Sequence, residues 1–154
     1  MNKGSFDSAI GRIIVEDDGS FITRVYVDNA FIGSGDNSRL FITAKTQLEE
    51  YFCGKRREFD IPLKLNGTEF QKTIWNALLT VPYGKTASYK DIAAMIGKPK
   101  AARAAGGANN KNPIIIIVPC HRVVGADGSL TGYAYGMDIK QKLLDIETKN
   151  TVDN

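Results

Sequence analysis

The hydrophobic pattern of this 154-residue chain changes its period near Pro62, and that change limits the folds open to it. Before Pro62, apolar and polar side chains alternate over residues 11–16 and 20–28, as in half-buried strands, and Asp17-Asp18-Gly19 supplies a turn between them. After Pro62, apolar residues recur at helical spacing. The sequence therefore predicts an α+β protein, in which a small antiparallel sheet with one helix precedes a mainly helical part.

The helix of the first part is expected from Ser38 or Arg39 to Phe52, followed by Gly54 as a stop. Its apolar face is formed by Phe41, Ala44, Leu48 and Phe52. A further short strand is expected at Phe31-Ile32. The expected domains are residues 1–60, a linker over 61–66, a second domain over 67–150 and a tail over 151–154.

Helix-start signals recur in the second part. Thr68 with Gln71, and Ser88 with Asp91, have the spacing of capping boxes, in which side chains satisfy backbone donors at a helix start. Pro99 suits the first turn of an alanine-rich third helix. We therefore expect three short helices between residues 67 and 107.

The second and third of these helices have the spacing of a helix-turn-helix, with a glycine turn between them. Basic residues surround them, opposed by the single acid Asp91, and these are Lys85, Lys90, Lys98, Lys100, Arg103 and Lys111. This excess suits a phosphate backbone. Because alanines can read few base edges, we expect sequence-independent docking on double-stranded DNA, or docking in the minor groove. An ordinary helical hairpin with a solvated basic face is the alternative.

The chain's only histidine follows a cysteine in Pro119-Cys120-His121-Arg122-Val123. The apolar run Ile114–Val118 before it is expected to be a fully buried strand. The thiolate is the reactive form of cysteine, and a nearby base populates it near neutral pH. Cys120 and His121 are therefore candidates for nucleophilic chemistry. A structural thiol beside a surface histidine is the alternative.

Glu147 is the candidate partner of this imidazole. The last helix, expected from about Asp138 to Thr148, places Glu147 on the same side as the apolar Leu143. A carboxylate beside an apolar face needs a partner. A solvated glutamate near a fraying helix end is the alternative, and residues 149–154 are expected to be a frayed tail.

Composition excludes several other classes. Two cysteines cannot form a disulfide framework, and with one histidine they cannot supply a four-ligand zinc cluster, so neither metal nor cofactor is expected. Cys53 is expected to be a buried small hydrophobe or a bystander. No apolar run reaches the length of a membrane span, and the first residues lack a signal peptide's apolar stretch. We therefore expect a soluble, cytoplasmic protein.

The motifs of residues 51–147 occur in the order and spacing of a known family. They are Tyr51-Phe52-x-Gly54, Pro62-Leu63, Gly67-Thr68-x-Phe70-Gln71, Trp75, Pro82-x-Gly84-x-Thr86-x-Ser88-Tyr89, Ile92-Ala93, Ile96-Gly97-x-Pro99, Ala102-Arg103-Ala104, Gly107-Ala108, Asn112-Pro113, Pro119-Cys120-His121-Arg122-Val123, Gly128, Gly132-Tyr133, Lys140, Leu143-Leu144 and Glu147. In these motifs the chain closely resembles the O6-alkylguanine-DNA alkyltransferases, also called methylated-DNA–protein-cysteine methyltransferases. Residues 1–50 carry no such motifs, and their pattern only agrees with the family's ribonuclease-H-like N-terminal domain.

The resemblance implies direct-reversal DNA repair, in which Cys120 irreversibly accepts a methyl or other alkyl group from O6-alkylguanine. O4-alkylthymine is a further candidate substrate. It implies that His121 deprotonates Cys120 through a water and that Glu147 orients the imidazole. Asn112 would brace the turn that holds the site. Tyr89 would donate a hydrogen bond to the lesion base or assist its phosphate to rotate.

The resemblance also implies base flipping, because an O6-alkyl carbon lies within the stack, where a buried thiolate cannot reach it. Arg103 would fill the gap left in the duplex. Backbone groups at Cys120 and Val123, with Tyr133 and Lys140 nearby, would shape the guanine pocket. Further contacts with DNA or with the pocket are expected from Ser88, Lys98, Lys100, Ala102, Ala104, Ala134 and Tyr135. The protein is expected to be a monomer, with cooperative binding along DNA left open.

Two positions depart from the family's pattern. In the family, the tyrosine at position 133 is usually followed by one residue and then by two glycines. In this chain Ala134 is followed by Tyr135-Gly136, so a phenol stands where a small residue normally lines the pocket mouth. A second proline is common at the position of Ile115. We predict that methyl removal persists while bulky adducts such as benzyl react more slowly. A Tyr135 ring that turns outward without effect is the alternative.

Three rival functions remain at this point. An alkyltransferase-like binding module lacks the acceptor cysteine, so Cys120 argues against it. A regulatory helix-turn-helix protein would need base-reading side chains on its second helix, and these are scarce. A cysteine hydrolase is the third. A role as a sensor of the adaptive response is not expected, since no additional cysteine-rich domain is present.

Overall fold

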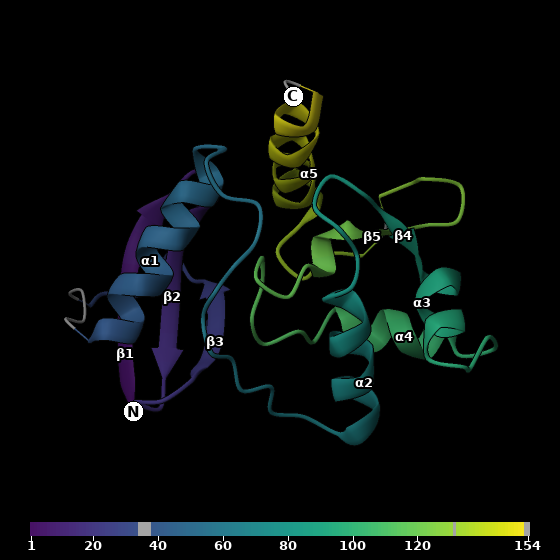
Figure 1. Ribbon diagram of the computed structural model, residues 1–154, viewed down its shortest axis with the longest axis horizontal. Helices are drawn as coiled ribbons and strands as arrows, with labels where there is room; N and C mark the ends of the chain where they lie inside the picture. Colours follow the sequence, from purple (N-terminus) through teal and green to yellow (C-terminus); the bar gives the residue numbers. More distant parts are fainter. Residues whose placement is uncertain (34–37, 131, 153–154) are drawn as a thin grey trace. The chain divides into compact units, whose positions relative to one another are not determined.

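The computed structural model describes residues 1–33, 38–130 and 132–152. The chain divides into two compact units, Met1–Leu65 and Asn66–Asn154 (Figure 1). The first contains a three-stranded antiparallel sheet and a helix, and the second is mainly helical. The predicted α+β class is therefore confirmed. Within the described ranges, no helix combines the length and apolarity that a membrane crossing requires.

The sheet of the first unit has the strand order β1-β2-β3. Its strands are β1 (Asn2–Ser8), β2 (Gly11–Asp17) and β3 (Ile22–Val27). The β2–β3 hairpin follows the alternation in the sequence, but β1 was not predicted. Gly4 and Phe6 are its only buried residues, so its alternation signal is weak. The strand expected at Phe31-Ile32 is wrong, because these residues lie outside every strand.

Helix α1 (Arg39–Phe52) covers one face of this sheet (Figure 1). Its N-cap is Ser38, whose hydroxyl accepts a hydrogen bond from Phe41 N. The Phe41 ring meets Phe6 of β1 edge-on, with centroids 6.5 Å apart. Cys53, directly after the helix, is exposed, which excludes the buried alternative for this residue and leaves the expectation of a bystander.

An extended segment closes the first unit beside β3. Ile22 N donates to Pro62 O at 2.9 Å, and Lys64 N donates to Ile22 O at 2.9 Å. Leu63 thus forms an isolated parallel bridge with Ile22. Pro62, Leu63 and Lys64, which were predicted to belong to a linker, therefore form backbone hydrogen bonds or a bridge with β3.

The second unit is built from helices joined by a short parallel strand pair. Its elements are α2 (Glu69–Leu78), β4 (Ala87–Ser88), α3 (Tyr89–Met95), α4 (Ala102–Asn109), the 3₁₀ turn η1 (Cys120–Arg122), β5 (Val123–Val124) and α5 (Met137–Val152). Both predicted capping boxes are present, at the starts of α2 and α3. Buried Trp75 ties α2 to α4 by donating from Nε1 to Ala108 O at 2.9 Å. Strand β4 pairs with β5, which fixes the start of α3 beside the residues after η1.

Two predictions for the second unit are wrong. Residues 114–118 are buried as expected, but they form no strand: Ile114 makes only an isolated bridge, residues 115–118 turn, and Ile116 has a φ of 71°. An apolar run reports burial but cannot by itself distinguish a strand from another buried conformation. Of the frayed tail expected over residues 149–154, residues 153–154 lie outside the described residues, and the part up to Val152 is instead helical. There Thr151 Oγ1 donates to Glu147 O, and Asn150 Nδ2 donates to Ile146 O.

Candidate active site

Cys120 sits at the start of η1, after the buried turns of residues 114–118, and is 3 % exposed. Asn112 links the two ends of this loop. Its Nδ2 donates to Val118 O at 2.7 Å, and its Oδ1 accepts from Ile114 N at 3.0 Å. Cys120 N donates to the same Val118 carbonyl at 2.8 Å. Asn112 is thus positioned to hold the backbone that presents the thiol.

The residue after the cysteine, His121, belongs to a buried imidazole–carboxylate pair. His121 Nε2 is 2.6 Å from Glu147 Oε2, and the exposures of these residues are 0 % and 1 %. The solvated-glutamate alternative is therefore excluded. Helix α5 contacts η1 directly, which brings together residues that are 26 positions apart. Spacing on the helix predicted this pairing correctly.

Arg122 binds the other side of the same carboxylate. Its Nε donates to Glu147 Oε1 at 2.8 Å, and its Nη2 donates to Glu147 Oε2 at 3.2 Å. Its Nη1 donates to Val81 O at 2.7 Å. Gly84 N adds a fourth donor to the carboxylate, at 3.1 Å from Oε1. The carboxylate is therefore held from two sides.

The environment of this pair sets its protonation. Burial would raise the pKa of Glu147, but hydrogen bonds from His121 and Arg122, the charge of Arg122 and, once the imidazole is protonated in acid, the charge of His121 outweigh burial and lower that pKa to about 2. Burial lowers the pKa of His121, and the charges of Arg122 and Lys140 act in the same direction. Near neutral pH the carboxylate is ionised and the imidazole is neutral. Nε2–H then donates to Glu147, so Nδ1 carries the lone pair that can take a proton.

The thiol itself is protonated in the resting protein. Burial raises the pKa of Cys120, while Asn112, Tyr133 and the charge of Lys140 act in the opposite direction. The Tyr133 hydroxyl lowers the pKa of the thiol and so favours the thiolate. In the resting arrangement this hydroxyl has no hydrogen-bond partner among the described residues. Lys140 is fully buried, and its Nζ donates to Val123 O at 2.5 Å. A base is therefore needed to generate the nucleophile.

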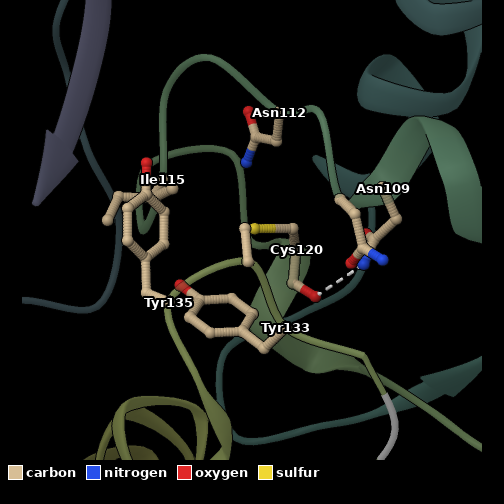
Figure 2. Close-up of a pocket in the computed structure, with 8 residues that line it drawn as sticks. Asn109, Asn112, Ile115, Cys120, Tyr133 and Tyr135 are labelled. Atoms are coloured by element: carbon tan, nitrogen blue, oxygen red, sulfur yellow. Dashed lines mark hydrogen bonds between the residues drawn. The ribbon is translucent and has the colours of Figure 1, made fainter.

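A small pocket adjoins the thiol (Figure 2). It is lined by Asn109, Asn110, Asn112, Ile115, Cys120, Tyr133, Ala134 and Tyr135. The rings of Tyr133 and Tyr135 meet edge-on, with centroids 5.9 Å apart. The cavity volume is about 10 Å³, which is about the space of one water molecule. A purine can enter only if some of these side chains move.

A larger, open groove of about 360 Å³ lies at α3 and α4, lined by Tyr89, Ala102, Arg103, Gly106 and Gly132. Arg103 is exposed in this groove. A Cβ at Gly106 would lie 3.4 Å from the Tyr89 ring, at ordinary van der Waals distance, so α4 packs beside this ring. Helices α3 and α4 contact each other, as a helix-turn-helix requires.

The other residues predicted to contact DNA lie on the same two helices or beside them. Lys100 and Ala104 are exposed, and the Lys98 ammonium lies 5.6 Å from the Phe70 ring centroid. Ser88 is committed locally, because its hydroxyl accepts from Asp91 N as the N-cap of α3. Because this cap uses the hydroxyl only as an acceptor, its O–H can still donate to a phosphate oxygen.

Comparisons with known proteins agree across both units. The family described as "6-O-methylguanine DNA methyltransferase, DNA binding domain" matches residues 69–149, and its "ribonuclease-like domain" matches residues 1–65. A methylated-DNA–protein-cysteine methyltransferase of Methanosarcina acetivorans is 48 % identical over 156 residues, covering 96 % of this chain and 98 % of that protein. One of Mycobacterium leprae is 49 % identical over 148 residues, covering 93 % and 90 %. The chain belongs to this family.

Solved structures of methyltransferases have the same fold. The OGT of Mycobacterium tuberculosis in complex with DNA superposes with a TM-score of 0.90 at 45 % identity, covering 97 % of this chain and 94 % of that one. An O6-methylguanine DNA methyltransferase of Methanococcus jannaschii gives a TM-score of 0.69 at 29 % identity, covering 94 % and 92 %. The likeness therefore extends over both units of this methyltransferase-family protein.

Two polar residues of this methyltransferase-family site were not assigned a role from the sequence. Arg122 belongs to the cysteine motif, but the sequence does not show that its partner is Glu147. Asn109, the last residue of α4, is 2 % exposed and donates from Nδ2 to Cys120 O at 3.3 Å (Figure 2). A polar residue at the end of an alanine-rich helix was the available signal for Asn109.

Proposed function

We propose that this protein repairs alkylated DNA by transferring the alkyl group of O6-alkylguanine to Cys120. The observation that carries the proposal is the buried cysteine followed by an imidazole that a buried, ionised carboxylate holds at 2.6 Å. The DNA-bound OGT at 45 % identity and the names of the relatives support the substrate class.

The proposed reaction is a direct displacement. His121 Nδ1 takes the thiol proton through a water molecule, and the thiolate attacks the alkyl carbon. The sulfur–carbon bond forms while the carbon–O6 bond breaks, and the electron pair passes to the base, which regains a proton as guanine. Glu147 holds the imidazole in the tautomer that can accept the proton. Because a thioether has no water-labile bond, each molecule acts once.

The geometry also supports a route to the damaged base. An O6-alkyl group within the stack cannot reach a thiol that is 3 % exposed, so the base must leave the duplex. In the proposal, α4 docks in the minor groove through its small side chains, independently of sequence. Arg103 occupies the gap, and Tyr89 contacts the lesion base or its phosphate. In the proposal the protein acts as a monomer and is cytoplasmic.

The pocket residues are assigned by their positions around the sulfur. The Val123 backbone, Tyr133 and Lys140 shape the base site, and Ala134 and Tyr135 border its mouth. Lys140 belongs to this group because its charge favours the thiolate. Asn112 maintains the loop that presents the cysteine.

Intact-protein mass measurement tests the proposal. After incubation with duplex DNA containing O6-methylguanine, the protein should gain one methyl group, located on the peptide that contains Cys120. Cys120→Ala should abolish the gain. Cys53→Ser is the matched control, since Cys53 is the other free thiol and is exposed. DNA binding without a mass gain would instead indicate a binding module, and repeated turnover without modification would indicate a hydrolase.

A further inference from the structure

Three places in this chain join an asparagine or aspartate to a glycine, and they are Asp18-Gly19, Asn66-Gly67 and Asp127-Gly128. At such a pair the backbone nitrogen of the glycine can attack the side-chain carbonyl carbon of the residue before it. Glycine hinders this attack least, because it has no Cβ. The attack also requires that other hydrogen bonds do not hold the nitrogen and the side chain. The structure therefore decides which of the three pairs can react.

Both aspartate pairs are held in tight turns. Gly19 N donates to Asp17 Oδ1 at 2.9 Å, and Asp18 Oδ1 accepts from two backbone N–H groups at 2.9 and 2.8 Å. In the second pair, Gly128 N donates to a backbone carbonyl at 2.8 Å, and Asp127 Oδ1 accepts from a backbone N–H at 3.0 Å. In each pair the nitrogen and the carboxylate must leave these hydrogen bonds before they can react with each other.

The pair Asn66-Gly67 is not held in this way. Both residues are exposed and lie outside every strand and helix, directly before α2. Within residues 1–33, 38–130 and 132–152, neither the Asn66 side chain nor Gly67 N has a hydrogen-bond partner. No other asparagine of the chain precedes a glycine. This position alone combines the reactive pair with an uncommitted amide and an uncommitted backbone nitrogen.

We infer that Asn66 is a site of spontaneous deamidation, a reaction in which water is the only co-reactant. A bond forms between Gly67 N and Asn66 Cγ while the Cγ–Nδ2 bond breaks, and ammonia leaves with the proton of the Gly67 amide. Water then opens the five-membered imide. Opening at Cγ gives aspartate, whereas opening at the backbone carbonyl gives isoaspartate, in which the main chain runs through the former side chain. Either product adds one negative charge. The inference is independent of the alkyl transfer proposed above.

Isoaspartate at this position loosens the start of α2, because it inserts one methylene into the main chain directly before Gly67 and the N-cap Thr68. The backbone is closely packed there, since a Cβ on Gly67 would lie 2.5 Å from the Trp75 ring. Trp75 in turn ties α2 to α4 through its hydrogen bond to Ala108 O. The lengthened chain displaces Gly67 relative to this ring and so changes the environment of the tryptophan.

The test follows the folded protein at mildly alkaline pH, where the Gly67 amide loses its proton more readily, beside a sample unfolded in guanidinium chloride. Cation-exchange chromatography should resolve a form that has lost one unit of the net charge of +3. Peptide mapping with electron-transfer fragmentation should place isoaspartate at position 66. In the unfolded sample all three pairs should react. Folding should slow the two aspartate pairs about tenfold or more, since each must break a hydrogen bond, and should leave the Asn66 rate within about twofold.

Asn66→Gln should abolish the charge shift, because the longer side chain would have to close a six-membered ring. Asn76→Gln is the matched control, since it makes the same change at an exposed position of α2 that precedes an alanine, and the shift should persist. Absence of the acid at position 66 in the folded protein, equal protection of all three pairs, or a shift that remains in Asn66→Gln would overturn the assignment of the site.

The fluorescence of Trp75, the only tryptophan, tests the structural effect. The isolated isoaspartate form should have a shifted emission spectrum relative to the unmodified protein, whereas the isolated aspartate form, which keeps the normal main chain, should not. Identical spectra for the isoaspartate form and the unmodified protein would overturn the proposed loosening of α2.

Discussion

Among single residues, Glu147 is the point on which the polar contacts of the site converge. Its carboxylate contacts His121, two nitrogens of Arg122 and the backbone N–H of Gly84. Donors from several directions fix the carboxylate, and the carboxylate in turn fixes the tautomer of the imidazole. The candidate pairing of Glu147 with His121 was predictable, because helix spacing placed the carboxylate beside Leu143. The contribution of Arg122 was not, since nothing in its sequence neighbourhood indicates which acid it meets.

Tyr135 is the residue most open to a direct test of substrate range. Its ring contacts Tyr133 at the edge of a cavity of about 10 Å³, so a bulky O6 adduct must displace it. Tyr135→Gly should raise the ratio of benzyl to methyl transfer rates by about tenfold or more. The measurement is single-turnover transfer from duplexes containing O6-benzylguanine or O6-methylguanine.

Tyr135→Phe is the control for this change, because it keeps the ring and should keep the ratio. A ratio that is the same in Tyr135→Gly and in the unaltered protein would show that the ring turns away from the adduct and has no effect.

At the level of elements, the turn between α2 and β4 supports the site from outside it. Val81 O accepts from Arg122 Nη1, and Gly84 N donates to Glu147 Oε1. The Tyr83 ring centroid lies 5.6 Å from the Arg122 guanidinium carbon. In the sequence, Pro82-x-Gly84 stands only among the motifs shared with the family. Its support of the site depends on which helix packs against the turn, and the sequence does not show that.

Gly84→Ala tests this element. Gly84 has a φ of +77°, and a Cβ there would lie 2.3 Å from Thr151 Oγ1 on α5. We expect a loss of about 1–3 kcal/mol in the free energy of unfolding, together with slower alkyl transfer. Urea unfolding followed by the fluorescence of Trp75, the only tryptophan and a buried one, gives the first quantity.

Gly128→Ala separates backbone strain from displacement of the turn. Gly128 has a φ of +84°, but a Cβ there meets no atom within 4 Å. This variant should lose less stability than Gly84→Ala and should transfer methyl groups at the normal rate. Equal effects of the two substitutions would refute a specific role for the turn.

At the level of the whole molecule, every residue of the proposed site lies in the second unit, Asn66–Asn154. Its buried charged groups also link folding to pH. The folded-state pKa of Glu147 is about 2, below the ordinary value of 4.5, so its stabilisation is present above pH 4.5 and is lost as pH falls towards 2. The pKa of His121 is lowered from 6.5 by burial, so acid favours its unfolded, protonated form.

The free energy of unfolding should therefore decrease from about neutral pH downward, and the part due to Glu147, about 3 kcal/mol, should be lost as pH falls from 4.5 to 2. Glu147→Gln should be destabilised by about that amount near pH 7, and the difference should vanish towards pH 2. Urea titrations at several pH values, read by Trp75 fluorescence, measure this. Asp145→Asn is the control on the same helix, because Asp145 is exposed. Parallel pH profiles for the Glu147 variant and the unaltered protein would contradict the assignment.

The sequence alone determined the α+β class, the two capped helix starts, and the pairing of a motif cysteine and histidine with a carboxylate on the last helix. The class and the helix starts follow from short-range spacing, which acts before any distant contact forms. The pairing was expected from the resemblance to a known family and from the position of Glu147 on the apolar face of its helix. The tertiary structure decided that residues 114–118 turn rather than extend, that Arg122 shares Glu147 with His121, and that Asn109 and Tyr135 border the thiol. Each of these depends on which distant segments pack together, and the local sequence pattern does not show which segments do so.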